Sequence, residues 1–311
     1  MNIKKNNIGV VMTSDNNYAQ HLGVALKSIN DNLDSSTLLD VRIIENNILE
    51  KNKTKIEKVL SSEHNISFLP FDISNREMYP INVHVSSVTY YRIFLPEIIE
   101  DSVKKVIYLD PDIIVQGDIS ELWRVDVENW HLAAVKDYGF SRHEDLKIPK
   151  GSDYFNSGVM LINLERWRRD NIKTKTLDYI FHNADTIKLW DQDALNAILH
   201  DKWKKLNPKW NLQYNMLKGS IREDKDILRA AVSDPEIIHY TSTNKPWEYS
   251  CLHPEKELYY EYIKKTPWKN YKARITIIGV LKKVAKIFFI ITPSPAKKYF
   301  KGVYLYLKRF F

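Results

Sequence analysis

Short β-branched runs and longer helical stretches alternate along the N-terminal part of the chain, and this alternation limits the fold more than any other feature. The runs 8–13, 39–44 and 66–69 are rich in valine, isoleucine and leucine, which indicates strands. Apolar residues recur at helical spacing over 19–29, and a charged helix is expected over 48–60. Strands that alternate with helices favour an α/β fold in which helices cover both faces of a mostly parallel sheet.

Acidic side chains follow several of the predicted strands. Asp15 comes just after the first strand, Asp110 and Asp112 follow a later one, and Asp137 follows another. Ligands of open α/β sheets bind outside the carboxyl ends of the strands, so we expect these acids along one rim. Two carboxylates one residue apart suit a hard cation such as Mg²⁺ or Mn²⁺, which often joins carboxylates to substrate phosphates. The alternative is a solvated acidic turn in which Pro111 stops the strand.

The single cysteine and the low glycine content exclude several kinds of site. Cys251 is the only cysteine among 311 residues, so an intrachain disulfide and a cysteine-based zinc site are impossible, and we expect a reducing compartment. The N-terminus has no apolar stretch of signal-peptide length, which favours a cytoplasmic protein. Neither a G-x-G-x-x-G fingerprint nor a P-loop is present, so we expect a nucleotide to be held through a metal.

Six blocks of residues resemble, in the same order, the family 8 glycosyltransferases, retaining enzymes that include the galactosyl- and glucosyltransferases of bacterial lipopolysaccharide. The blocks are Asp15–Tyr18, Ser87–Arg92, Lys105–Asp112, Tyr154–Leu164, Asp191–Asp193 and His239–Trp247. The resemblance implies a GT-A catalytic domain over 1–261, with a Rossmann-like, mixed but mostly parallel sheet flanked by helices. It also implies transfer of a hexose from UDP-galactose or UDP-glucose to a hydroxyl of a lipopolysaccharide-type or other glycan or glycolipid acceptor.

The resemblance further implies a role for each matched side chain. The metal, Mn²⁺ or Mg²⁺, would be bound by Asp110, Asp112 and His239. The UDP moiety would be held by Thr13, Asp15, Asn17, Tyr18, Ser242 and Lys245, together with the two metal-binding aspartates. The sugar and the reacting centre would be surrounded by Arg92, Asp137, Asn156, Asp191 and Gln192.

Each of these positions also has a structural interpretation. Asp15 and Asp191 are good helix N-caps, and Tyr18 could pack on the core. A histidine that follows two isoleucines, as His239 does, is often a structural residue, and Arg92 alone would be an ordinary solvated charge. Asn156 and Gly158 could form a plain turn.

One position departs from the family pattern. The family usually has His-x-x-Gly-x-x-Lys-Pro-Trp, and this chain has Ser242 where the glycine is expected. Glycine lets the backbone approach a diphosphate closely, whereas the Cβ of serine can crowd the ligand or forbid a positive φ. Pro111 between the two acids removes an N–H group but no oxygen ligand, so we expect the metal site to tolerate it.

Retention at the anomeric carbon needs either a nucleophile on the β-face or departure and attack on one face. By resemblance Gln192 occupies the β-face position, and because an amide is a poor nucleophile we favour the one-face route, with the UDP phosphate helping to deprotonate the acceptor. Two other functions stay open. A haloacid-dehalogenase-like phosphatase also has an Asp-x-Asp motif, but near its N-terminus and with threonine or valine where this chain has Ile114. A non-catalytic, membrane-bound sugar-nucleotide-binding relative is the other.

The C-terminal segment 262–311 differs from the rest in charge. Of the 46 Lys and Arg residues thirteen lie there, with no Asp or Glu, so the first 261 residues hold 33 basic and 39 acidic side chains. Ile277, Leu281, Val284 and Phe288 recur at helical spacing opposite three lysines, which predicts a basic amphipathic helix.

This tail favours peripheral attachment to the inner, anionic face of the cell membrane. No run of apolar residues in this segment is long enough to span a bilayer. Docking of the helix on the acidic body is one alternative. Binding of single-stranded nucleic acid is another, but no nucleic-acid-binding signature accompanies the tail, and we expect no nucleic-acid partner.

Overall fold

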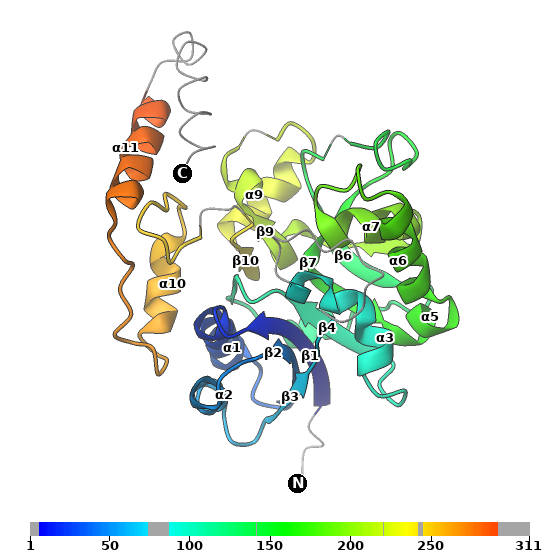
Figure 1. The fold of residues 1–311 in the computed structure, drawn as a ribbon, viewed down its shortest axis with the longest axis horizontal. Helices are drawn as coiled ribbons and strands as arrows, with labels where there is room; N and C mark the ends of the chain where they lie inside the picture. Colours follow the sequence, from blue (N-terminus) through cyan, green and yellow to red (C-terminus); the bar gives the residue numbers. More distant parts are fainter. Residues whose placement is uncertain (1–5, 74–86, 141, 220, 242–244, 292–311) are drawn as a thin grey trace. The chain divides into compact units, whose positions relative to one another are not determined.

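A sheet of seven strands organises the computed structural model of the protein. Its strands are β1 (Asn6–Asp15), β2 (Thr37–Asn46), β3 (Asn65–Pro70), β4 (Lys105–Leu109), β6 (Leu132–Lys136), β7 (Phe155–Asn163) and β8 (Trp203–Lys205). They lie in the order β3-β2-β1-β4-β7-β6-β8, and among them only β7 runs against its neighbours. Figure 1 labels all of these strands except β8. The predicted mixed, mostly parallel sheet is therefore confirmed.

The structure describes residues 6–73, 87–140, 142–219, 221–241 and 245–291. It divides the chain into two compact units, Met1–His239 and Tyr240–Phe311. The boundary expected between 261 and 262 rests on charge rather than on compactness, and it stays a prediction about where a membrane-associated tail begins.

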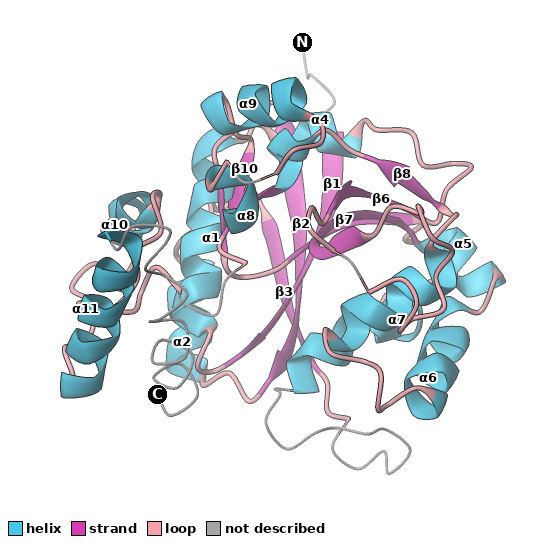
Figure 2. Cartoon of the chain, turned by 90° about the horizontal axis from the view of Figure 1, so that it is seen from above, coloured by secondary structure: helices cyan, strands magenta, loops and turns pink. Residues whose placement is uncertain are grey.

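Helices cover both faces of the sheet in the first unit. They are α1 (Ala19–Asn32), α2 (Glu50–Glu57), α3 (Leu95–Ile98), α4 (Ile119–Trp123), α5 (Leu164–Arg169), α6 (Ile172–His182), α7 (Trp190–Leu199), α8 (Tyr214–Leu217) and α9 (Lys225–Ser233), with 3-10 helices η1 (Ser87–Phe94) and η2 (Pro208–Asn211). Figure 2 shows α1 and α2 on one side of the sheet and α5, α6 and α7 on the other. On the latter side, Trp167, Leu195 and Tyr91 pack with Tyr108 and Met160 of the sheet in one buried cluster.

The single reversed strand brings an internal segment to the rim. Leu109, the last residue of β4, pairs with Val159 of β7, and the Asp110 backbone N–H donates to the Gly158 carbonyl at 2.8 Å. The first residues of β7 therefore lie beside the point where β4 ends, because the two strands run in opposite directions. Asn156 was also open to interpretation as part of a plain turn, but the structure places it in strand β7.

A second, three-stranded sheet was not predicted. It consists of β5 (Ile113–Val115), β9 (Leu212–Gln213) and β10 (Ile237–His239), in the order β5-β10-β9. His239 pairs with Ile113, the residue directly after Asp112. Backbone hydrogen bonding thus brings residue 239 next to a carboxylate that lies more than a hundred positions earlier in the sequence.

The chain around Pro96 is helical on both sides of the proline. Residues 87–94 form a 3-10 helix, and α3 then begins at Leu95 and includes Pro96 in its first turn. Proline is tolerated there because the first helical N–H groups have no partner within the helix. The helical segment therefore continues through the proline as far as Ile98.

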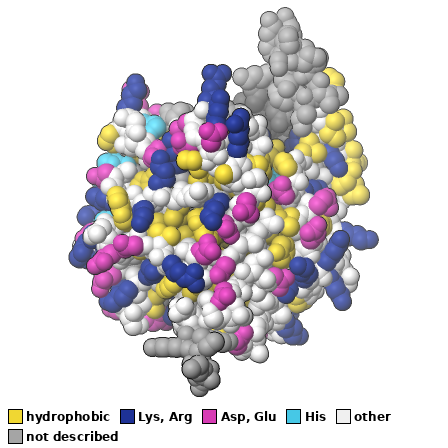
Figure 3. All heavy atoms as spheres, turned by 180° about the vertical axis from the view of Figure 1, so that it is seen from behind, with side chains coloured by type: hydrophobic (Ala, Val, Ile, Leu, Met, Phe, Trp, Pro, Cys, Tyr) yellow, Lys and Arg dark blue, Asp and Glu magenta, His cyan; other side chains and the backbone are white. Residues whose placement is uncertain are grey.

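The second unit contains two helices, α10 (Lys256–Ile263) and α11 (Ile277–Ile291). The amphipathic helix expected from the spacing of Ile277, Leu281, Val284 and Phe288 is confirmed, and all four of these side chains are exposed. None of the helices in the described part of the chain is long and apolar enough to cross a membrane. On the face shown in Figure 3, basic and acidic side chains are interspersed.

Candidate functional site

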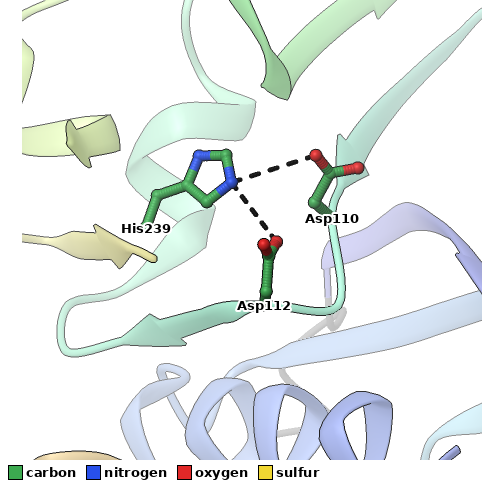
Figure 4. A group of neighbouring side chains, drawn as sticks. All are labelled: Asp110, Asp112 and His239. Carbon is green, nitrogen blue, oxygen red and sulfur yellow. Dashed lines mark ion pairs between the residues drawn. The ribbon is translucent and has the colours of Figure 1, made fainter. Parts of the chain in front are cut away.

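Asp110, Asp112 and His239 converge at the rim of the first unit (Figure 4). The His239 Nε2 atom lies 3.3 Å from Asp112 Oδ1 and 3.9 Å from Asp110 Oδ2, and one ligand atom from each residue lies within 4.8 Å of the others. An octahedral cation about 2.1 Å from each ligand atom would hold neighbouring ligands roughly 3 Å apart and opposite ones about 4 Å apart. Two carboxylate oxygens and one imidazole nitrogen at these separations fit a divalent cation such as Mn²⁺ or Mg²⁺.

The carboxylate of Asp110 is oriented by its neighbours. Its Oδ1 atom accepts hydrogen bonds from Arg92 Nη2 at 2.9 Å and from the Tyr108 hydroxyl at 3.1 Å. Its other oxygen, Oδ2, is the one that faces His239. One oxygen is thus fixed to the protein, while the second points toward the place where a cation would be bound.

Arg92 is buried and joins three parts of the site. Besides Asp110, its Nε atom pairs with Asp191 Oδ2 at 3.0 Å, and its Nη1 atom donates to the carbonyl and the hydroxyl of Ser157 at 2.6 and 3.0 Å. Burial raises the pKa of Asp191 to about 6; the positive charge of Arg92 lowers this pKa, and the negative charge of Asp110 raises it. The guanidinium group therefore holds the rim together from inside.

Gly158 makes the convergence possible for a steric reason. A Cβ atom added there would lie 2.2 Å from His239 Cε1 and 2.7 Å from Asp110 Oδ2. Such contacts are far below van der Waals separation, so the imidazole and the carboxylate occupy the space that any other side chain would need.

A set of side-chain amides lies next to the acids. Gln192 Oε1 accepts from the Ser157 backbone N–H at 3.0 Å and from Asn156 Nδ2 at 3.2 Å, and Gln192 Nε2 donates to Asp137 Oδ2 at 3.0 Å. Burial raises the pKa of Asp137, and the hydrogen bonds from Gln192 and Asn156 act in the opposite direction. The five residues expected around the sugar, which are Arg92, Asp137, Asn156, Asp191 and Gln192, are therefore brought into one hydrogen-bonded group.

The residues expected to hold uracil and ribose lie where β1 ends, beside β4. Thr13 is buried, and its hydroxyl is 2.9 Å from the Tyr108 hydroxyl. Asp15 Oδ1 accepts from the Tyr18 backbone N–H at 3.0 Å, but the N-cap of α1 is Tyr18, so the prediction of Asp15 as the cap was wrong. Asn17 is exposed and Tyr18 half-buried. Their contact with a nucleotide stays a prediction.

The two remaining predicted residues belong to the second unit. Lys245 Nζ donates to the Tyr240 carbonyl at 2.7 Å. Ser242, the position at which the chain departs from the family pattern, lies outside the described residues.

Sequence reasoning missed Asn211, which the structure places against the metal-binding residues. Its Oδ1 atom is 3.0 Å from His239 Nδ1, and its Nδ2 atom donates to Asn156 Oδ1 at 2.9 Å. The available signal was a polar residue between Trp210 and Leu212, since a polar side chain among buried apolar ones needs a buried partner.

Known proteins share both the sequence and the fold. The profile of glycosyl transferase family 8 matches residues 9–251. General stress protein A of Bacillus subtilis (strain 168) is 38% identical over 272 residues, covering 84% of this chain and 94% of that protein. The lipopolysaccharide 1,2-glucosyltransferase of Escherichia coli (strain K12) is 26% identical over 272 residues, covering 85% of this chain and 79% of that protein.

A solved structure agrees with the fold. The galactosyltransferase LgtC, crystallised with donor and acceptor sugar analogs, is similar with a TM-score of 0.75 and 26% identity, and the similarity covers 88% of this chain and 100% of that one. The expected GT-A fold is confirmed by this likeness, and a phosphatase of the haloacid-dehalogenase type is inconsistent with it. By its profile match and its relatives, this chain belongs to glycosyl transferase family 8.

Proposed function

We propose that the protein transfers a hexose, galactose or glucose, from a UDP-sugar to a hydroxyl group of a glycan or glycolipid, with retention at the anomeric carbon. The observation that carries the proposal is the convergence of Asp110, Asp112 and His239 at the rim of a family 8 fold. A divalent cation bound there, Mn²⁺ by preference, would offset the negative charge of the departing diphosphate.

The protein's own side chains hold the donor sugar in this proposal. Asp137, Asn156 and Gln192 present a hydrogen-bonded group of carboxylate and amide atoms suited to sugar hydroxyls. Arg92 is almost inaccessible, so its part is to orient Asp110 and Asp191. Thr13, Asp15, Asn17 and Tyr18 would bind uracil and ribose, and Lys245 would take a phosphate oxygen as a point charge.

We favour departure and attack on one face of the sugar. Gln192 carries an amide, and its oxygen already accepts hydrogen bonds from Asn156 and Ser157, which makes it a still weaker nucleophile. The bond between the anomeric carbon and the diphosphate oxygen breaks, and a bond to the acceptor oxygen forms. The acceptor proton passes to an oxygen of the departing UDP.

The test is turnover of UDP-galactose and UDP-glucose by purified protein with Mn²⁺, scored as UDP release. Asp110→Asn and Asp112→Asn should each lower turnover about a thousandfold, equivalent to about 4 kcal/mol of lost transition-state stabilisation. Asp40→Asn is the matched control, because Asp40 lies on β2 and pairs with Arg42 away from the rim. Undiminished turnover in both rim variants would remove the metal from the mechanism. Binding of UDP-sugar by wild type without any turnover would indicate a non-catalytic relative.

We further propose that α11 attaches the protein peripherally to an anionic membrane. Lys286 Nζ donates to the Ser250 carbonyl at 3.1 Å, and Lys283 Nζ lies 4.7 Å from the centre of the Tyr249 ring. The lysine side of the helix thus contacts its own unit, while Leu281 and Val284 are exposed on the apolar side. A membrane-bound enzyme would be suited to a glycolipid or lipopolysaccharide-type acceptor. Binding of full-length protein to anionic but not neutral vesicles would support this attachment, and equal recovery from both would contradict it.

A further inference from the structure

Two backbone N–H groups of β7 determine how the neighbouring side-chain amides are oriented. The Ser157 N–H donates to Gln192 Oε1 at 3.0 Å, and the Gly158 N–H donates to Asn156 Oδ1 at 3.1 Å. A backbone N–H group can only donate, so the atom that faces it in each amide must be the oxygen. The remaining bonds agree, because Asn156 Nδ2 then donates to Gln192 Oε1 and Gln192 Nε2 to the Asp137 carboxylate.

The same logic passes from Asn156 to Asn211. Asn156 Oδ1, whose identity the Gly158 N–H fixes, also lies 2.9 Å from one end of the Asn211 amide. That end must be the NH₂ group, because two oxygens would repel each other. The opposite end of Asn211 is therefore its oxygen, and this oxygen lies 3.0 Å from His239 Nδ1. An amide oxygen only accepts, so His239 Nδ1 carries a proton.

We propose that Asn211 is a positioning residue that keeps His239 in the tautomer able to bind a cation. With Nδ1 protonated, a neutral imidazole has its lone pair on Nε2, the nitrogen that faces Asp110 and Asp112. In the other tautomer an N–H group would point at the two carboxylates and occupy the cation's place. The inference rests on the metal role proposed above.

Asn211 and the two carboxylates favour different tautomers of His239. The two carboxylates favour a proton on Nε2, since hydrogen bonds to charged groups are stronger than those between neutral groups. Asn211 opposes this because a lone pair on Nδ1 would face its oxygen with no proton between them. It is fully buried at the end of η2, held by Asn156 on its other side, and so cannot turn away. Partners of this kind on metal-binding histidines fix the tautomer and the ring orientation.

The test is the protonation state of His239 Nδ1, read from the ¹⁵N signals of histidine-labelled full-length protein without metal. The shifts of the two ring nitrogens distinguish either neutral tautomer from the doubly protonated ring, so the tautomer is read where the spectrum shows the neutral form. Wild type should show a proton on Nδ1 and a lone pair on Nε2, and Asn211→Ala should show the reverse. Mn²⁺ affinity should fall about tenfold to a hundredfold in the same variant.

Two further variants separate positioning from folding. Asn207→Ala removes the cap that Asn207 provides to Lys209 at the start of the same 3-10 helix, so it loosens η2 without touching His239 and should leave both readings unchanged. Asn211→Asp keeps an acceptor against Nδ1, so it should keep the proton there even if its stability falls.

The outcomes distinguish this inference from the function on which it rests. An Nδ1 without a proton in wild type or in Asn211→Asp would overturn the inference, as would Asn211→Ala with its Nδ1 still protonated. Absence of Mn²⁺ binding in wild type would instead contradict the proposed metal role, since the tautomer is measured without metal.

Discussion

In most proteins charged side chains are exposed and apolar ones are buried. The rim of the first unit departs from this by burying charge, and helix α11 of the second unit departs from it by exposing apolar side chains. The rim buries charge: Arg92 and Asp191 are almost inaccessible and paired with each other. α11 exposes apolar surface at Leu281 and Val284, while Lys286 is partly covered and burial lowers its pKa.

This contrast shows why charge can stay buried at the rim while apolar surface stays exposed on α11. Charge stays buried at the rim because ion pairs and hydrogen bonds from fixed neighbours offset its desolvation. Apolar surface stays exposed on α11 at Leu281 and Val284, and such surface commonly marks a site of contact with a partner or a membrane. The rim should therefore be sensitive to substitution in its folding, and α11 mainly in its binding.

The largest effect is expected from Arg92→Met, which leaves the carboxylates of Asp110 and Asp191 without their cation. We expect a loss of about 3–5 kcal/mol in the free energy of unfolding, measured by urea denaturation. Arg169→Ala, which removes an exposed partner of Asp170, should lower the free energy of unfolding far less, because ion pairs at the surface contribute little to stability. Equal losses in the two variants would show that the buried pairs are not what holds the rim.

The loss in Arg92→Met should also depend on pH. Burial already raises the pKa of Asp191 to about 6, above the value near 4 of an unfolded chain, and removal of Arg92 raises it further. A carboxyl group whose pKa is raised by folding binds its proton more tightly in the folded state, so it destabilises the fold as pH rises. The deficit relative to wild type should therefore be larger at pH 8 than at pH 5.

Gly158→Ala should have an intermediate effect, concentrated on the cation site. The new methyl group would overlap the imidazole of His239 and the carboxylate of Asp110, and overpacking of this kind costs about 1–3 kcal/mol. Mn²⁺ affinity, measured by titration calorimetry, should fall in the same variant. Gly9→Ala is the control, because its methyl group would meet no atom closer than 3.6 Å. Full Mn²⁺ affinity in Gly158→Ala would mean that the two ligands can separate without cost.

The smallest effect on folding is expected on α11. Leu281→Gln with Val284→Gln should change the free energy of unfolding by less than about 0.5 kcal/mol, because the two side chains are 50% and 58% exposed. Binding to anionic vesicles should weaken about tenfold to a hundredfold.

A matched pair on another helix provides the control for that variant. Ile227 and Val232 of α9 are 49% and 38% exposed, so Ile227→Gln with Val232→Gln removes similar apolar surface from the first unit. Vesicle binding should stay unchanged. An equal loss in both double variants would indicate a general effect of surface hydrophobicity rather than a membrane-binding helix.

The order of strands and helices and the grouping of Asp110, Asp112 and His239 could be predicted from the sequence. Local periodicity predicts the order of strands and helices, and the spaced motifs of a known family predict the grouping of the three metal-binding residues. The interior position of Arg92 could not be predicted, because it depends on partners 18, 65 and 99 positions away along the chain. Asn211 was missed for the same reason, since its partners Asn156 and His239 lie far from it in sequence.

Strand direction was also beyond local reasoning. Alternation of strands and helices predicts parallel neighbours, and nothing in the composition of 155–163 signals that β7 is reversed. The second sheet escaped prediction because β9 and β10 are two and three residues long, too short for a periodic pattern.

The position of His239 at the end of the first unit has a consequence for regulation. The chain passes from this imidazole directly into Tyr240, the first residue of the second unit. Movement of the second unit would therefore act first on one of the proposed cation ligands, and a change in Mn²⁺ affinity on vesicle binding is the result expected if the two proposed sites are coupled. Because such linkage is reciprocal, vesicles that tighten Mn²⁺ binding would themselves be bound more tightly by the Mn²⁺-loaded protein.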